Sequence, residues 1–460
     1  MTELMSPCGN FETLLAAIKA GCDSVYFGVK ELNMRTGRAK NFELKDLNKI
    51  KKICAENNIR CYITLNSIVY DNELDNVDNI LNEVKKAKID AVIASDWSVI
   101  LKARKKGVAV HISTQQSCCN IEALKHFSKF ADMIVLAREL SLEQIKAIKE
   151  RIVKEKIKGP SNKLIKIEAF CHGAMCISVS GRCFMSQFVY GCSANRGKCL
   201  QNCRREYEVF CYDDEYCGNE NYANEKKNAD KCINDGKEYI IKDTEEGHEL
   251  KLGKGYVMSP KDICTLKILD KLMSYIDKDD NRIIDVLKIE GRGRSVDYIY
   301  TVTKVYRTAI DLIKKNNYNE KNKKKLMTQV KKVYNRGFSN GFYMGVPLNE
   351  WSKAYGSKAA QRKVYVGKVI NYFGKTKVAE ILIEAGEKEV VLKKGSKIVF
   401  TGETTGYVEC DINEMLNSSN NKPIKSTKQG QKITVKVDSL KNNEKLRKNN
   451  KVFAVINSKI

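Results

Sequence analysis

Nine of the 17 cysteines in the chain fall between residues 171 and 232, and the first of them follow the apolar run LIKIEAF. Thiols at this density, directly after a predicted strand, are typical of metal ligation, whereas a cysteine within a helix or strand is more often a small core residue. We therefore predict that this segment binds a metal. Its cysteines are Cys171, Cys176, Cys183, Cys192, Cys199, Cys203, Cys211, Cys217 and Cys232.

The spacing of these cysteines favours an iron–sulfur cluster over zinc. Zinc sites of the knuckle type usually carry two C-x₂-C pairs, and no such pair occurs in the segment. Cys176, Cys183, Cys199 and Cys203 are spaced more loosely, which four thiolates around a cluster tolerate because a cluster is larger than one ion. Zinc stays open as the alternative metal.

A cysteine peptidase would need a thiolate, a histidine base and an orienting group. The chain has four histidines: His111, His126, His172 and His248. His172 adjoins Cys171, but neighbours on an extended strand point to opposite faces, so the two make a poor dyad. The segment gives no support to peptide hydrolysis, and we expect His172 to act instead from the wall of a substrate pocket.

Charged residues at other predicted strand ends could complete a site. Glu290, in the stretch KIEGRGRS (288–295), could reach the same pocket as a catalytic group. Arg292 and Arg294 stand in the glycine-flanked loop after it and could hold a carboxylate or phosphate through bidentate bonds, although a solvated surface loop explains this stretch equally well. Gln115 and Arg138 follow two further strands, and helix capping explains their runs poorly. We predict Arg138 as a further catalytic group and Gln115 as a residue that binds a cofactor or co-substrate.

The elements that must position these residues alternate between two patterns. Short apolar runs are separated by amphipathic helical stretches, which indicates βαβ units and a parallel sheet. We predict a (β/α)₈ barrel of the TIM type, with chemistry at the strand ends, because the first turn, SPCGN, lacks the glycine pattern of a dinucleotide-binding fold. The sequence leaves open whether the first run or YVMSPKD is an accessory strand. The nine candidate runs are ELMSP, SVYFG, CYITLNS, AVIASD, AVHISTQ, MIVLARE, LIKIEAF, YVMSPKD and IIDVLKIEG.

The texture of the sequence changes twice after the barrel pattern. We predict a barrel over 1–312, interrupted by the cysteine-rich insert 171–255. A helical or loop linker follows over 313–360 and contains the glycine-rich loop NRGFSNGFYMG (335–345). From 361 to 460 the chain reads as alternating strands with turn signals, which predicts a small all-β barrel.

The charge and hydropathy of the chain bear on its partners. The net charge of +25 suits a polyanion such as RNA, although a lysine-rich proteome would produce the same excess. No apolar run approaches the roughly 18 residues of a membrane span, and the N-terminus lacks a secretory layout. We therefore expect a cytoplasmic protein with reduced cysteines and no membrane partner.

Several blocks of this sequence resemble one known family. EAFCHGAMCISVSGRCFMS (168–186) closely resembles the signature of the collagenase-like peptidases of unknown catalytic type, the thirty-second peptidase family of that class. SPCGNFETLLAAIKAGCDSVYFG is similar to the family's N-terminal stretch, with Cys8 where a small residue is usual. STQQSCCN, LARELSLEQI, MSPKDIC, KIEGRGRS, VYRTAID and NRGFSNGF resemble its other blocks in the same order, over about residues 3 to 345.

The resemblance implies a chemistry different from the family name. Several members are oxygen-independent hydroxylases with a four-iron, four-sulfur cluster. One branch forms 5-hydroxyuridine at the tRNA wobble position with prephenate, another hydroxylates a cytidine of ribosomal RNA, and a third acts in ubiquinone synthesis. Carried over to this sequence, Cys176, Cys183, Cys199 and Cys203 are the best matches to the cluster ligands, with Cys232 as a substitute.

The tRNA branch fits this chain best, because it too combines one barrel with a C-terminal β-barrel. Its members imply tRNA as substrate, a small carboxylate donor, and iron–sulfur assembly or electron-donor proteins as partners. Arg138, Arg292 or Arg294 would then hold the donor, with Gln115 beside it. EGRGRS, the extra cysteines and the polar insert depart from that branch. A collagenase-like peptidase, an rRNA hydroxylase and a non-enzymatic RNA-binding protein with a zinc clip remain alternatives.

Overall fold

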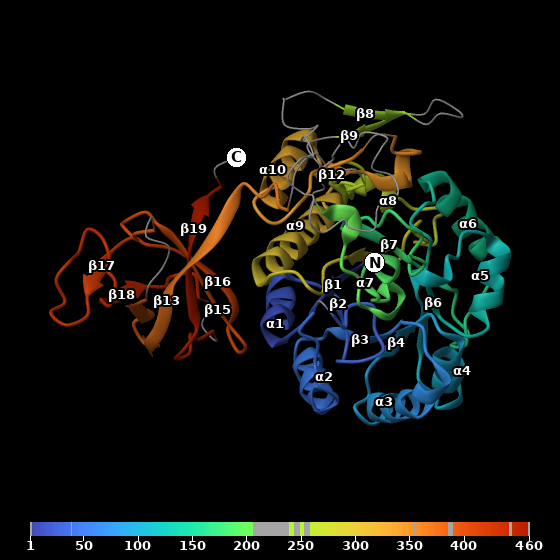
Figure 1. Cartoon of the computed structure of the whole chain (residues 1–460), viewed down its shortest axis with the longest axis horizontal. Helices are drawn as coiled ribbons and strands as arrows, with labels where there is room; N and C mark the ends of the chain where they lie inside the picture. Colours follow the sequence, from blue (N-terminus) through green and yellow to red (C-terminus); the bar gives the residue numbers. More distant parts are fainter. Residues whose placement is uncertain are drawn as a thin grey trace, which may run out of the picture.

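The computed structural model describes residues 2–37, 39–205, 239–242, 249–252, 258–348, 350–352, 356–384, 390–440 and 444–458. Eight parallel strands close into a barrel, since β11 pairs with both β1 and β7. This confirms the predicted TIM-like fold (Figure 1). The barrel strands are β1 (Glu3–Pro7), β2 (Ser24–Phe27), β3 (Arg60–Leu65), β4 (Ala91–Ala94), β5 (Val110–Ile112), β6 (Met133–Val135), β7 (Lys166–Gly173) and β11 (Val286–Ile289).

Amphipathic helices cover the outside of the barrel, with their apolar faces packed on the strands in one large core. The sequence sets their ends locally. In the first helix, Asn10 and Thr13 form a capping box, and Gly21 ends the helix with a φ of 90° that favours glycine. The flanking helices are α1 (Phe11–Ala20), α2 (Leu47–Glu56), α3 (Leu74–Lys86), α4 (Trp97–Lys105), α5 (Ile121–Ser128), α6 (Leu142–Lys154), α8 (Leu269–Leu272) and α9 (Val296–Lys314).

The accessory strand is the one from the run YVMSPKD. Its end forms β10 (Asp262–Cys264), which pairs antiparallel with β7 outside the closed barrel. β10 in turn pairs with β12 (Phe338–Ser339) from the NRGF stretch, which the sequence predicted to be a loop. A buried ion pair fixes this arrangement, because Arg336 Nε donates to Asp262 Oδ1 at 3.0 Å. The stretch expected to be a linker is therefore partly built into the barrel sheet, and helix α10 (Glu320–Val330) precedes it.

The cysteine-rich segment leaves the barrel after β7, which reaches Gly173. Among the described residues it holds one short helix, α7 (Met185–Tyr190), and a two-stranded hairpin of β8 (Tyr239–Lys242) and β9 (Glu249–Leu252). Cys211, Cys217, Cys232 and His248 lie outside the residues that the structure describes.

The C-terminal part is an antiparallel sheet with its own core, as the alternating pattern predicted. Its order is β16-β15-β19-β13-β14-β18-β17. The sheet curls, so that Cys410 Sγ on β16 lies 3.3 Å from the Lys436 oxygen on β18. Its strands are β13 (Gln361–Phe373), β14 (Val378–Ile383), β15 (Lys397–Gly402), β16 (Gly406–Asp411), β17 (Met415–Asn417), β18 (Lys432–Lys436) and β19 (Lys451–Asn457).

This sheet docks on the barrel through α1 and α9, as Figure 1 shows. The rings of Tyr300 and Tyr407 stack with centroids 4.5 Å apart, and Lys363 pairs with Asp297 at 2.6 Å. Ala16 and Val399 join the same small apolar cluster. The docking face lies on the flank of the barrel, so the strand ends stay free for a site.

Candidate functional site

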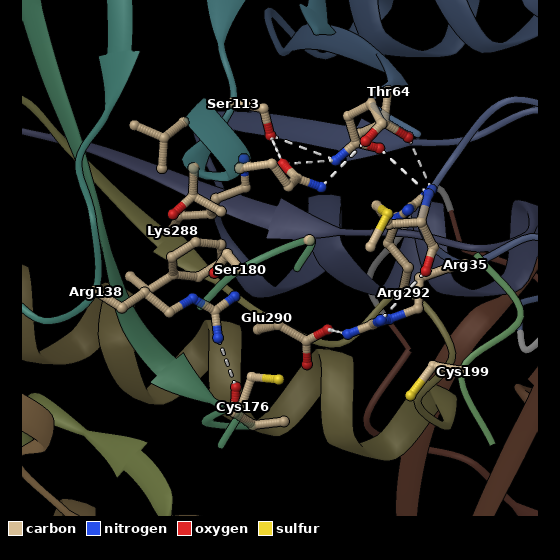
Figure 2. A pocket seen from close by; sticks show the side chains of 18 of the residues that line it. Arg35, Thr64, Ser113, Arg138, Cys176, Ser180, Cys199, Lys288, Glu290 and Arg292 are labelled. Carbon is tan, nitrogen blue, oxygen red and sulfur yellow. Dashed lines mark hydrogen bonds and ion pairs between the residues drawn. The ribbon is translucent and has the colours of Figure 1, made fainter. Parts of the chain in front are cut away.

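A pocket of about 160 Å³ lies at the carboxyl ends of the barrel strands. Its wall comes from the barrel and its roof from the cysteine-rich segment. Figure 2 shows Cys176 and Cys199 on one side of the pocket and Thr64 and Ser113 on the other. The carboxyl end of a TIM barrel is where its enzymes place their sites. The described lining includes Tyr26, Thr64, Ile93, Ser113, Val135 and Phe170 from the wall and Met175, Cys176, Ser180, Gly181, Cys199, Gln201 and Cys203 from the roof.

The four predicted ligand cysteines gather at this roof. Cys176, Cys199 and Cys203 line the pocket. Burial raises the pKa of the Cys203 thiol, although the positive charge of Arg204 lowers it. The neighbouring thiols of Cys176, Cys199 and Cys183 raise that pKa further. Each of the other three thiols is thus close enough to Cys203 to interact with it electrostatically. Among the described residues, no three His, Cys, Asp or Glu side chains form a group that could hold a single metal ion.

Other cysteines of the segment lie elsewhere. Cys171 is fully buried in β7 and makes a weak 3.4 Å contact from its Sγ to the Lys288 carbonyl oxygen. Cys192 is half-buried and does not line the pocket. Neither Cys171 nor Cys192 is among the cysteines that raise the pKa of Cys203, whereas the other three ligand candidates are.

Cations dominate the polar lining of the pocket. Arg35 Nη2 donates to Glu290 Oε1 at 2.6 Å. Arg292 is buried and donates through Nη1 to Asn33 Oδ1 at 2.9 Å and to Thr64 Oγ1 at 2.8 Å. The described lining holds five cationic side chains but one carboxylate, Glu290, so it suits an anion. The cations are Arg35, Arg138, Arg204, Lys288 and Arg292.

Glu290 is held in its ionised form. Burial alone would raise its pKa, but Arg35, Arg294 and Arg138 outweigh burial and lower that pKa to about 2. A carboxyl group with this pKa is not protonated near neutral pH and cannot donate a proton there. The sequence predicts Glu290 as a catalytic group, and its geometry makes it the anchor of Arg35.

Arg138 is placed to bind a ligand. Its Nη1 donates to the Ala174 oxygen at 2.9 Å, and its guanidinium lies 4.0 Å above the Phe170 ring. Its buried Nε has no hydrogen-bond partner among the described residues. Desolvation lowers the pKa of Arg138, as it lowers that of Arg292 to about 10. Anionic ligands would offset this desolvation.

Gln115 lies in the pocket as predicted from the strand end. Its Nε2 donates to the Asn66 oxygen at 3.2 Å, and Asn66 Nδ2 donates back to Gln115 Oε1 at 3.3 Å. Gly181 of the roof packs against this side chain: an added Cβ there would clash with Gln115 Cγ. Gln115 thus ties the wall to the roof.

Two predicted site residues lie outside the pocket, which corrects the sequence interpretation. The pairing register between β7 and β11 shifts beside Cys171, so Ile289 faces His172. A bulge breaks strict alternation, and the His172 ring packs against Tyr306 at 5.4 Å instead of entering the pocket with Phe170. Arg294 lies 3.6 Å above the Tyr334 ring and acts on Glu290 only through its charge.

No described histidine lines the pocket. His111 is buried against Tyr62, and burial lowers its pKa to about 3. His126 packs on Trp97 on the outer surface of the barrel. Burial lowers the pKa of His172 to about 4. The described pocket therefore has no thiol–histidine pair.

Sequence reasoning missed three of the pocket cations. Arg35 stands in the loop NMRTGRAK (33–40) after β2. The length of this loop is the one feature of the sequence that points to a role in the site. Lys288 interrupts the apolar strand VLKI, and a lysine within a buried strand needs a buried partner. Its Nζ lies 2.5 Å from Glu168 Oε1 inside the barrel. Arg204 directly follows Cys203 in the chain, and this adjacency to a candidate ligand is its only signal in the sequence.

In the described part of the chain, no helix is both long and apolar enough to cross a membrane.

Comparisons with known proteins find relatives that match almost the whole length of this chain. Residues 9–353 match the family described as Peptidase family U32. A collagenase of Porphyromonas gingivalis is 39% identical over 451 residues, which cover 98% of this chain and 97% of that protein. The tRNA hydroxylation protein P1 of Bacillus subtilis is 30% identical over 404 residues, which cover 87% and 83%.

The tRNA hydroxylation protein P of Escherichia coli is 26% identical over 381 residues, which cover 79% of this chain and 80% of that protein. These relatives agree with the family that the sequence motifs resembled. The chain belongs to peptidase family U32.

Proposed function

We propose that this protein is an oxygen-independent RNA hydroxylase that forms 5-hydroxyuridine at the wobble position of tRNA. The observation that carries the proposal is one pocket at the carboxyl end of the barrel, in which three thiols adjoin an arginine-rich wall. The fourth candidate thiol, Cys183, is close enough to raise the pKa of Cys203. The tRNA hydroxylation proteins of Bacillus subtilis and Escherichia coli, similar over most of their length, support this reading.

Cys176, Cys183, Cys199 and Cys203 would hold a four-iron, four-sulfur cluster. The donor set fits in kind, because such clusters take four thiolates, and Arg35, Arg138 and Arg204 all interact with these thiols through their charge. Within the described ranges no three such side chains form a close group, and the four thiols then suit a cluster better than one zinc ion, since each cluster iron takes its own thiolate. When bound, the cluster would supply electron transfer.

The arginines would bind a small carboxylate donor such as prephenate. Arg138 keeps its Nε for a ligand, and Arg292 is fixed by Asn33 and Thr64 so that its charge faces the pocket. Planar guanidinium groups match carboxylates in a bidentate manner. Glu290 orients Arg35, and the roof excludes water from the bound donor.

The target base must leave its stack to enter the pocket, since chemistry on a base requires it. A larger hollow of about 1390 Å³ offers contacts for the RNA backbone. A small cavity lies between the two, because Cys176 of the pocket and Lys261 and Ser339 of the hollow line it as well. The lysines of this hollow, here called the lysine groove, are Lys261, Lys267, Lys323, Lys324, Lys331 and Lys358.

The peptidase alternative rests on the collagenase name of a relative. It needs a nucleophile with a base, and the described pocket offers no histidine beside its thiols. A metal-free Cys176→Ser variant that still cleaves gelatin would establish it.

The deciding experiment is mass spectrometry of nucleosides from tRNA and rRNA of a deletion strain, complemented with variants. We expect loss of 5-hydroxyuridine, restored by the wild type and by Cys192→Ser but not by Cys176→Ser. Loss of a hydroxycytidine from rRNA would move the target to that RNA, and unchanged hydroxypyrimidines would refute hydroxylation. Metal analysis after anaerobic purification is a second test. We expect about four irons per chain, and a colourless protein with one zinc would contradict the proposed cluster.

A further inference from the structure

Exposed aromatic rings gather on the rim of the thiol-lined pocket. Phe188 is 87% exposed, Phe184 58% and Tyr70 55%, and Tyr190 is exposed as well. Three of these rings, Phe184, Phe188 and Tyr190, belong to one short stretch of chain, and exposed apolar side chains that cluster usually mark an interaction site. The Phe184 and Phe188 rings contact each other edge to face at 6.2 Å, which leaves a face of each open.

Arginines stack on two of these rings. The guanidinium of Arg196 lies 4.0 Å above Tyr70, and that of Arg205 lies 4.7 Å above Tyr190. Both arginines are held in place: Arg196 Nη2 donates to Glu73 Oε1 at 2.6 Å, and Arg205 Nη1 donates to the Tyr190 hydroxyl at 2.6 Å. Such pairs present flat cationic and aromatic surfaces side by side.

The rim is attached directly to the pocket. Helix α7, which carries Phe188, contacts the roof: the Leu200 N–H donates to Ser186 Oγ at 3.0 Å and Asn202 Nδ2 to the Met185 oxygen at 3.2 Å. On the other side, Tyr70 follows the pocket residue Asn66 by four positions. A ligand seated in the pocket would therefore have its neighbouring groups over these rings.

The charge of the rim selects its partner. Residues 174–205 contain Arg182, Arg196, Lys198, Arg204 and Arg205 but no Asp or Glu. Aromatic rings interleaved with cations are the features with which proteins hold single-stranded nucleic acid: the rings stack on bases and the cations contact phosphates.

We propose that Tyr70, Phe184, Phe188 and Tyr190, with Arg196 and Arg205, form a stacking platform for the unpaired bases that flank the target nucleotide. This inference rests on the proposed function and adds to it a requirement for unpaired bases beside the target, because the bases of a duplex keep their faces covered. A docked protein would instead need only the apolar surface of the rings.

The test compares binding of two RNAs to the anaerobically purified full chain: a stem-loop with an unpaired loop, and a duplex of equal length. We expect the Phe184→Leu/Phe188→Leu variant to bind the stem-loop about tenfold or more weakly, with duplex binding unchanged. Phe184→Trp/Phe188→Trp should keep wild-type affinity, since it keeps flat rings. Phe373→Leu is the matched control, because Phe373 is exposed on the C-terminal sheet.

The proposal is overturned if the leucine variant binds the stem-loop as tightly as the wild type, or if it loses affinity for both RNAs equally. A hydroxylation assay on the same proteins separates the two proposals. Loop binding that depends on the rings, without any hydroxypyrimidine, would refute the proposed reaction and still support the platform. Hydroxylation together with unaltered loop binding by the leucine variant would refute the platform alone.

Discussion

Glu290 Oε1 lies 2.6 Å from Arg35 Nη2, which joins the end of the last barrel strand to the loop after the second. The two residues are 255 positions apart in the chain. The Glu290 side chain is 11% exposed and that of Arg35 31%, so one wall of the pocket depends on a largely buried ion pair.

Breaking this pair should destabilise the barrel. We expect Glu290→Gln to lower the free energy of unfolding by about 2 kcal/mol, because it leaves Arg35 and Arg138 without their counter-charge. Arg35→Met alone should cost a similar amount, and the double variant should cost less than the sum. Urea unfolding followed by circular dichroism measures all three, and strict additivity would show that the pair makes no coupled contribution.

The same carboxylate should make stability depend on pH. Its pKa falls from 4.5 to about 2 on folding, so the unfolded chain binds more protons between these values. The stabilisation from Glu290 is therefore complete above about pH 4.5 and is lost as the pH falls toward 2. The difference in unfolding midpoint between wild type and Glu290→Gln should be constant from pH 7 to pH 5 and shrink below that. A difference that grows in acid would contradict the lowered pKa.

The lysine groove should give RNA binding a salt dependence that can be removed. Lys324 and Lys331 are exposed there and make no ion pair with another described residue. Lys324→Glu/Lys331→Glu should weaken tRNA binding and lower the slope of log affinity against log salt by about 1 to 2, as expected for two lost phosphate contacts. Lys105→Glu, on α4 across the barrel, is the control, and an equal effect there would show a non-specific charge effect.

Gly197 should control whether the roof can close. Its φ is 86°, and an added Cβ would meet Thr36 Oγ1 and the Asn33 oxygen in the loop that carries Arg35. Gly191 also has a positive φ, of 65°, but an added Cβ there meets nothing within 4 Å. Gly191→Ala should therefore cost only about 1 kcal/mol, whereas Gly197→Ala should also separate roof from wall.

The two glycine variants are compared by their iron content and by the rate of limited proteolysis in the segment 174–205. Gly197→Ala should retain less iron and be cleaved faster, while Gly191→Ala behaves like wild type. If Gly197→Ala is cleaved faster but keeps the same iron content, the contact between roof and wall is supported. The assignment of the cysteines as cluster ligands is then contradicted.

The sequence could predict the barrel because each of its elements has a local cause. Apolar runs such as AVIA, and caps such as Asn10, act over a few residues, so the strand order follows from their alternation. The residues after the strand ends, including Gln115 and Arg138, were found for the same reason. His172 was misplaced because a bulge at Cys171 depends on the register with another strand, which no single run encodes. Arg35 was missed because its role comes from a partner at the far end of the barrel.

All four candidate ligand cysteines precede β11, the strand that closes the barrel by pairing with β1 and β7. They therefore leave the ribosome before the barrel can close, while β7 still has a free edge. Any group loaded onto these thiols during synthesis would bind before the barrel wall beneath the roof is complete. The order of the elements along the chain thus provides an assembly window as well as a fold.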